Sequence, residues 1–173
     1  MYYDPIRRHE DEPNVGEILG RRPQARAAVR GSERYPDIRG EVRFHQTPRG
    51  VLVIAEVRGL PHKQEECASP IFGFHIHEGG GCTPRGGKDA FADTGMHDNP
   101  QHCPHPYHAG DLPPLFGAHG FAFSACLTDR FTVEQIIGKS IVIHSAPDDF
   151  TTQPSGNAGS KIACAEIVGA VER

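Results

Sequence analysis

The feature that most restricts how this chain folds is a long irregular stretch, from Gly79 to about Pro114. It is rich in Gly, Pro, His and Asp, and it shows neither the alternation of a strand nor the periodicity of a helix. A loop of this length within a compact domain needs something that orders it, because ordering the backbone costs conformational entropy. A metal ion or a disulfide would supply that order.

Strand-like segments lie on both sides of this loop. The sequence predicts short strands over Ala27–Gly31, Glu41–Gln46, Val51–Val57, Ile71–Glu78, Phe116–Leu127, Ser140–His144 and Lys161–Val168. The second and third form a hairpin around residues 48–50, and residues 145–160 form a second loop rich in Ser, Thr, Gly and Pro. Seven or eight short strands, two long loops, 20 Gly and 15 Pro predict an all-β sandwich or barrel.

Histidines concentrate in the loop and its neighbouring strands. Of 11 His, seven fall between His75 and His119. His75 and His77 are two residues apart, which places both side chains on one face of a strand. Alone, such a pair also fits an ordinary polar strand face. His144 ends another predicted strand and could add a further imidazole, although a single His at a strand end is more often ordinary.

A second set of candidate ligands lies within the loop. His97, His105 and His108 supply imidazoles, and Asp111 supplies a carboxylate. Three imidazoles and one carboxylate satisfy a closed tetrahedral zinc site. The alternative is a polar loop in which the histidines only satisfy backbone groups, but that alternative does not explain the ordering of the loop.

Five segments in order resemble the Cu,Zn superoxide dismutase family. They are Phe74-His-Ile-His-Glu78, His97-Asp-Asn-Pro100, His108-Ala-Gly-Asp111, Val142-Ile-His144 and Gly156-Asn-Ala-Gly-Ser-Lys-Ile-Ala-Cys164. The resemblance runs from about Ala25 to Val168. It implies a Greek-key β-barrel of about eight antiparallel strands with a metal-binding and disulfide loop and an electrostatic loop.

The resemblance also implies the site residues. Copper would be held by His75, His77, His97 and His144, and zinc by His97, His105, His108 and Asp111. His97 would bridge both metals and carry the catalytic proton. Asp148 would link the outward nitrogens of His75 and His105. Cys82 and Cys164 would form the disulfide, which leaves Cys67, Cys103 and Cys126 free.

The implied activity is superoxide dismutation, with copper cycling between Cu(II) and Cu(I) and zinc shaping the site. Lys161 occupies the position at which the family places an active-site Arg, so we expect a slower enzyme with a shallow salt dependence. The alternative is a non-enzymatic copper- and zinc-binding protein of the same fold. A metal-assisted hydrolase is a weaker third possibility, because no general base stands near an open zinc position.

The remaining expectations concern domains, partners and location. Residues 1–23 form an N-terminal extension, a tail or docking arm in which Val15–Leu19 could form one helical turn, and residues 24–173 form the metal-binding domain. A net charge of −4 offers nothing for nucleic acid, and no apolar run reaches the roughly 18 residues of a membrane span. Without a recognisable secretory signal, we expect a cytoplasmic protein unless a leader has been removed.

Two parts of the chain resemble different branches of the family. The spacing from His77 to Cys82 and from Cys82 to His97 resembles the bacterial branch, whereas residues 148–159 resemble the eukaryotic type. The two branches pair through different faces, so the sequence allows a homodimer but defines neither the oligomeric state nor the interface.

Overall fold

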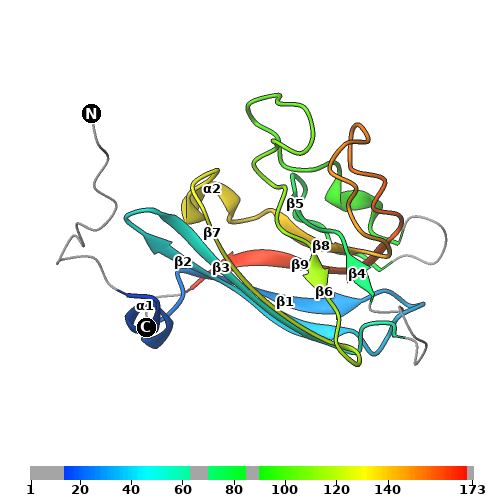
Figure 1. Ribbon diagram of the computed structural model, residues 1–173, viewed down its shortest axis with the longest axis horizontal. Coiled ribbons are helices and arrows are strands. Elements are labelled where there is room, and N and C mark those ends of the chain that lie inside the picture. The colour runs from blue at the N-terminus through cyan, green and yellow to red at the C-terminus, as the bar shows by residue number, and fades with distance from the viewer. Residues whose placement is uncertain (1–13, 63–69, 85–89, 171–173) are drawn as a thin grey trace, which may run out of the picture.

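The computed structural model describes residues 14–62, 70–84 and 90–170, and within them nearly all regular structure is strand (Figure 1). The strands are β1 (Ala25–Gly31), β2 (Arg39–Thr47), β3 (Gly50–Arg58), β4 (Ile71–Phe72), β5 (Phe74–His77), β6 (Leu115–Phe116), β7 (Phe121–Thr128), β8 (Ser140–His144) and β9 (Lys161–Gly169). The helical elements are α1 (Val15–Gly20), α2 (Val133–Ile136) and a 3₁₀ turn over Ala92–Thr94.

Seven strands form one antiparallel sheet in the order β5-β8-β9-β1-β2-β3-β7, and β4 pairs with β6. Because β4 runs directly into β5 and β6 leads into β7, the β4–β6 pair joins the two open edges of the sheet. The last strand, β9, lies beside the first, so long connections cross between the two sides of the barrel. This is the predicted Greek-key β-barrel.

The predicted hairpin of β2 and β3 is confirmed, with an unbroken register from Arg39↔Arg58 to Thr47↔Gly50 around a two-residue turn. Two other predicted strands are each divided in the structure. The segment 71–78 is interrupted at Gly73, where a side chain would meet the Cβ atoms of Ala158 and His144 at 2.8 and 3.2 Å. The segment 116–127 turns at His119 and Gly120, which both have positive φ angles. Each correction places an interruption of a predicted strand next to the β4–β6 pair.

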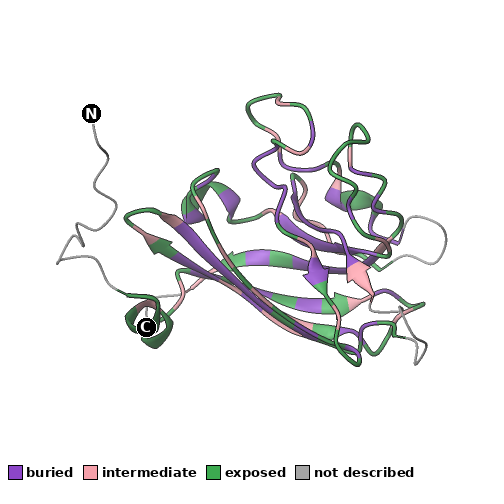
Figure 2. Ribbon diagram, in the orientation of Figure 1, coloured by how far each residue is buried: buried purple, intermediate pink, exposed green. Residues whose placement is uncertain are grey.

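The core follows from the alternation of side chains along the strands (Figure 2). In β1, Ala25, Ala27 and Val29 are buried, while the residues between them are exposed. Phe74 and Ile76 of β5 point into the same core. His75 and His77 therefore project from the outer surface of the barrel wall. In Figure 1 the loops that follow β5 and β8 lie together above this part of the wall.

The helices are short and were only partly predicted. α1 matches the expected helical turn, and its N-cap is Asn14, whose side chain forms a capping box with Glu17. α2 was not predicted, although Thr132 and Gln135 form the same kind of box and its Thr-x-x-Gln signal is present in the sequence. No helix within the described residues is long and apolar enough to cross a membrane.

Candidate metal centre

Three of the predicted ligands are positioned by paired strands. His75 and His77 lie on β5, and His144 ends β8, which pairs with β5 over Phe74↔Ile143 to His77↔Ser140. All three project from the outer face of the barrel, yet none is more than 4% exposed. The two long loops cover them. The strand geometry therefore fixes the backbone of these residues, and the loops exclude water from their side chains.

The first long loop is ordered by hydrogen bonds to the free edge of β5. The Asp98 amide donates to the Ile76 carbonyl at 2.8 Å, and the Ile76 amide donates to the Gly110 carbonyl at 2.9 Å. Isolated bridges pair His77 with His97 and His75 with Asp111. The loop thus behaves as an irregular neighbouring strand, and it places two predicted ligands beside the two that β5 carries.

These residues form two adjoining groups that share one member. His75, His77, His97 and His144 make up the four-histidine group; His97, His105, His108 and Asp111 make up the histidine–aspartate group. In each group, one candidate ligand atom per residue lies within 4.8 Å of all the others. The structure therefore brings together every residue that the sequence predicted for the two metals.

The hydrogen bonds of His77 and His144 leave two lone pairs facing each other. His77 Nδ1 lies 3.0 Å from the Gly95 carbonyl oxygen and His144 Nδ1 lies 3.3 Å from that of Gly159, so both Nδ1 atoms must carry the proton. Both Nε2 atoms are then unprotonated, and they lie 3.2 Å apart. Two such acceptors repel each other unless a cation binds between them, which fits a metal ion.

Asp148 sets the orientation of two further imidazoles. Its Oδ2 and Oδ1 lie 2.7 Å from His75 Nε2 and 2.9 Å from His105 Nε2. Both rings donate through Nε2, so their Nδ1 atoms are free to bind a metal. Those Nδ1 atoms are buried without a hydrogen-bond partner. Buried acceptors left unpaired are costly, and a metal ion would satisfy them.

His97 lies between the two groups. Its Nδ1 is 2.8 Å from Asp111 Oδ1, while its Nε2 is buried and has no hydrogen-bond partner. The ring centroids of His75 and His77 lie 3.9 and 4.9 Å from that of His97. On the other side, the Nδ1 atoms of His105 and His108 lie 3.0 and 3.3 Å from Asp111 Oδ2. The ring therefore offers one nitrogen to each group.

Burial favours the neutral form of four of the imidazoles, which is the form that binds metals. It lowers the pKa of His75 and of His108, and it lowers the pKa of His77 well below the usual range. Burial and the neighbouring His75 lower the pKa of His144 to about 3. Burial alone would raise the pKa of Asp111, but its contacts with His97 and the other imidazoles lower it overall. The centre thus combines neutral nitrogens with a charged carboxylate.

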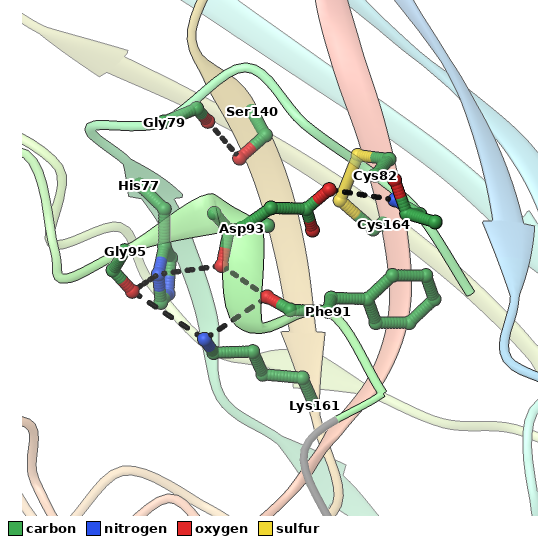
Figure 3. Close-up of a disulfide and its surroundings, with 11 residues drawn as sticks. His77, Gly79, Cys82, Phe91, Asp93, Gly95, Ser140, Lys161 and Cys164 are labelled. Atoms are coloured by element: carbon green, nitrogen blue, oxygen red, sulfur yellow. Dashed lines mark hydrogen bonds between the residues drawn. A yellow bond between two sulfur atoms is a disulfide. The ribbon is translucent and has the colours of Figure 1, made fainter. Parts of the chain in front are cut away.

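Figure 3 shows Lys161 and the disulfide together with His77, a member of the four-histidine group. The Lys161 ammonium is 3.2 Å from the Phe91 carbonyl oxygen and 3.4 Å from that of Gly95, which also accepts from His77. Cys82 and Cys164 form the predicted disulfide, with their Cα atoms 5.6 Å apart. The bridge attaches the segment that leads to Phe91 and Gly95 to β9, the strand that begins with Lys161.

Cys103 and Cys126 are free thiols, as expected. Cys67 lies outside the described residues, so the expectation that it is unpaired stays a prediction.

Two contacts that support the centre were not predicted. Arg130 Nη1 donates to the carbonyl oxygens of Pro106, His108 and Asp111 at 3.0 to 3.2 Å, and so holds the histidine–aspartate segment from outside. Gly156 has a φ of 65°, and a side chain there would meet Asp148 Oδ1 at 2.1 Å. The position of Gly156 in a Gly-Asn-Ala-Gly run hints at such a constraint, whereas nothing in the local sequence indicates the partners of Arg130.

The fold and these two groups define a class of protein: a Greek-key β-barrel that carries a copper- and zinc-binding centre on its outer wall. The family model for copper/zinc superoxide dismutase (SODC) matches residues 38–167. The chain belongs to the copper/zinc superoxide dismutase family.

Bacterial relatives agree with this assignment. Superoxide dismutase [Cu-Zn] 2 of Aquifex aeolicus is 33% identical over 146 residues, which cover 76% of this chain and 80% of that protein. Superoxide dismutase [Cu-Zn] of Photobacterium leiognathi is 31% identical over 141 residues, or 74% and 78% of the two chains. The superoxide dismutase-like protein YojM of Bacillus subtilis is 33% identical over 116 residues, covering 58% and 57%.

Proposed function

We propose that this protein is a superoxide dismutase that holds copper in the four-histidine group and zinc in the histidine–aspartate group. The observation that carries the proposal is the placement of His97, which offers Nδ1 to one group and a buried Nε2 to the other. When bound, copper supplies reversible one-electron chemistry, and zinc supplies a fixed charge without redox activity.

The ligand atoms follow from the hydrogen bonds. We assign Nδ1 of His75 and Nε2 of His77, His97 and His144 to copper. We assign Nδ1 of His97, His105 and His108, with the Asp111 carboxylate, to zinc. In His75, His77, His105 and His144, the assigned nitrogen is the one left unprotonated because the opposite nitrogen donates a hydrogen bond. His97 serves both groups. His108 is assigned through Nδ1 because that buried atom has no hydrogen-bond partner and lies 3.3 Å from Asp111 Oδ2.

His97 and Lys161 would act on the substrate. In the overall reaction two superoxide anions and two protons give one dioxygen and one hydrogen peroxide. His97 Nε2 would bind either copper or a proton. In its protonated form it would pass the proton to the reduced oxygen species, which is general acid catalysis by a ligand. The Lys161 ammonium would attract the superoxide anion.

The second candidate is a metal-binding protein with little or no dismutase activity. Two observations favour it: the Lys161 ammonium already contacts two backbone carbonyl groups, and one relative is named only as superoxide dismutase-like. The complete set of copper ligands favours the enzyme.

One experiment separates the candidates. The protein is loaded with both metals, copper and zinc per chain are measured, and superoxide decay is followed for the wild type, His144→Ala and a control, His62→Ala. The His62 ring lies outside both groups. Activity in the wild type and the control that disappears in His144→Ala supports the dismutase. Full occupancy without activity refutes it.

The cytoplasmic location and the homodimer stay predictions, and so do the absence of nucleic-acid and membrane partners and the division at residue 23. Sedimentation of the metal-loaded protein tests the dimer. Fractionation of the native host tests the location.

A further inference from the structure

A row of three arginines crosses the outer face of the barrel, away from the metal centre. Arg30 on β1 is paired with Arg39 on β2, and Arg39 is paired with Arg58 on β3. Each arginine directly follows a buried core residue and is itself exposed, so the three side chains share the outer face. Arg58 is opposite Phe121 on β7, a residue that is 46% exposed. The row therefore ends in an accessible aromatic side chain.

This row lines a hollow of about 460 Å³ on the sheet surface. Its lining includes the three arginines, Phe121 and Ala28, whose small side chain leaves space between longer neighbours. Paired residues on adjacent antiparallel strands have Cα atoms about 4.5–5.5 Å apart, so the row from Arg30 to Arg58 extends over about 10 Å. The hollow therefore has the size of a small molecule, and the row is longer than a single small anion.

The charge of the row is not neutralised within the described part of the chain. The two carboxylates in the hollow, Glu41 and Glu56, are both paired with Arg43, and Glu41 also lies 3.8 Å from Arg26. No side chain among residues 14–62, 70–84 and 90–170 forms an ion pair with any arginine of the row. Like charges directly opposite each other on a sheet are destabilising, and this row has two such pairs in a chain with a net charge of −4.

We infer that the row formed by Arg30, Arg39 and Arg58 is a binding site for a chain of phosphate groups. The planar guanidinium donates paired hydrogen bonds to phosphate oxygens, and neighbouring phosphates can engage successive guanidinium groups. The ligand is an inorganic oligophosphate or the phosphate chain of a nucleotide. In the second case the base would contact Phe121.

The test is calorimetric titration of the copper- and zinc-loaded protein with inorganic tripolyphosphate, at low and at moderate salt. The variant is Arg39→Gln, which removes the central guanidinium. The matched control is Arg22→Gln, which makes the same charge change at an exposed position outside the hollow. Metal content is measured again afterwards, because tripolyphosphate binds metal ions.

We expect one saturable site per chain in the wild type. Arg39→Gln should weaken it about tenfold or more, and Arg22→Gln by less than about twofold, since a hydrogen bond to a charged group carries such a factor. Affinity should fall as salt rises. The inference is wrong if no saturable binding occurs at low salt, or if both variants weaken binding equally.

Thermal unfolding gives an independent readout. Without phosphate, Arg39→Gln should unfold at a higher temperature than the wild type, because it removes two like-charge contacts. Tripolyphosphate should raise the unfolding temperature of the wild type more than that of the variant at the same concentration. If the variant is less stable without phosphate, the row has a structural role and the inference fails.

A nucleoside triphosphate, titrated into the wild type and Phe121→Ala, identifies the source. Tighter binding than tripolyphosphate, with the gain lost in Phe121→Ala, indicates a nucleotide; equal affinities indicate an inorganic chain. None of these residues belongs to the metal centre. Superoxide decay should therefore be unchanged in every variant.

Discussion

Asp148 connects the two halves of the metal centre, and its removal should affect them unequally. In Asp148→Ala, His75 and His105 both lose the carboxylate that accepts from Nε2. His75 stays fixed, because β5 is bonded to β8 on one side and to the first long loop on the other. His105 lies outside regular structure, where its backbone is held by two hydrogen bonds with the Gln153 side chain. Zinc binding should suffer more than copper binding.

The size of the effect follows from the two hydrogen bonds. Each lost acceptor leaves a buried N–H unpaired, at a cost of about 1–3 kcal/mol. Loss of such an outer partner weakens metal binding about 10- to 100-fold. We expect the zinc dissociation constant to rise by the upper value, about 100-fold or roughly 2.7 kcal/mol, because the freed His105 ring can rotate. We expect the copper dissociation constant to rise by the lower value, about tenfold, because β5 still holds the His75 ring in place.

Competition titrations with chromophoric chelators measure each dissociation constant while the other site is filled. Asp149→Ala is the control, since that carboxylate accepts from Thr151 and Thr152 and contacts neither ring. It should change both constants by less than about threefold, as most exposed substitutions have small effects. Copper binding weakened as much as zinc binding, or neither weakened, would show the argument to be wrong.

Three further predictions follow from the same structure. Lys161→Arg should accelerate superoxide decay at low salt, since a planar guanidinium presents more donors to the anion than an ammonium does; pulse radiolysis measures this, and an unchanged rate contradicts the steering argument. Cys164→Ser should lower the free energy of unfolding in urea by about 4.5 kcal/mol, the loop-closure value for the sequence separation of 82 residues; a loss below about 1 kcal/mol would contradict it. The metal-free protein should lose stability as pH falls from about 6.5 toward 3, because the unfolded chain protonates His144 near 6.5 while the folded chain protonates it only at about 3. The slope is up to about 1.4 kcal/mol per pH unit for each such group, and urea midpoints that stay level between pH 7.5 and 5 would refute it.

The sequence was most informative where chemistry repeats at a short spacing. His75 and His77 were predicted to share a face, and β5 places them so. The disulfide and the pairing of β2 with β3 were also predicted correctly. These features depend on local periodicity or on a family pattern that spans most of the chain, so the amino-acid sequence is enough to predict them.

Other features depend on contacts between distant segments and were missed. The break at Gly73 lies where the chain changes its partner strand from β6 to β8, and Ala158 and His144 from another part of the chain leave no room for a side chain there. Arg130 donates to three carbonyl groups about 20 residues earlier in the chain. Every residue has a backbone carbonyl, so the sequence does not show which of them accept. The arginine row is likewise invisible until the register aligns three separate strands. Tertiary pairing determines these features, and local propensity does not encode them.

The hydrogen bonds between β5 and the first long loop have a consequence beyond ligand placement. A sheet border with unpaired amides and carbonyls recruits strands from other molecules, and natural proteins cover such borders. Here the cover is the segment carrying His97 and Asp111, two residues that we propose as metal ligands. Metal loss would therefore do more than abolish redox chemistry. By loosening this segment, it would expose the edge of β5 to strands of other molecules. The tendency of the protein to aggregate should therefore depend on its metal content.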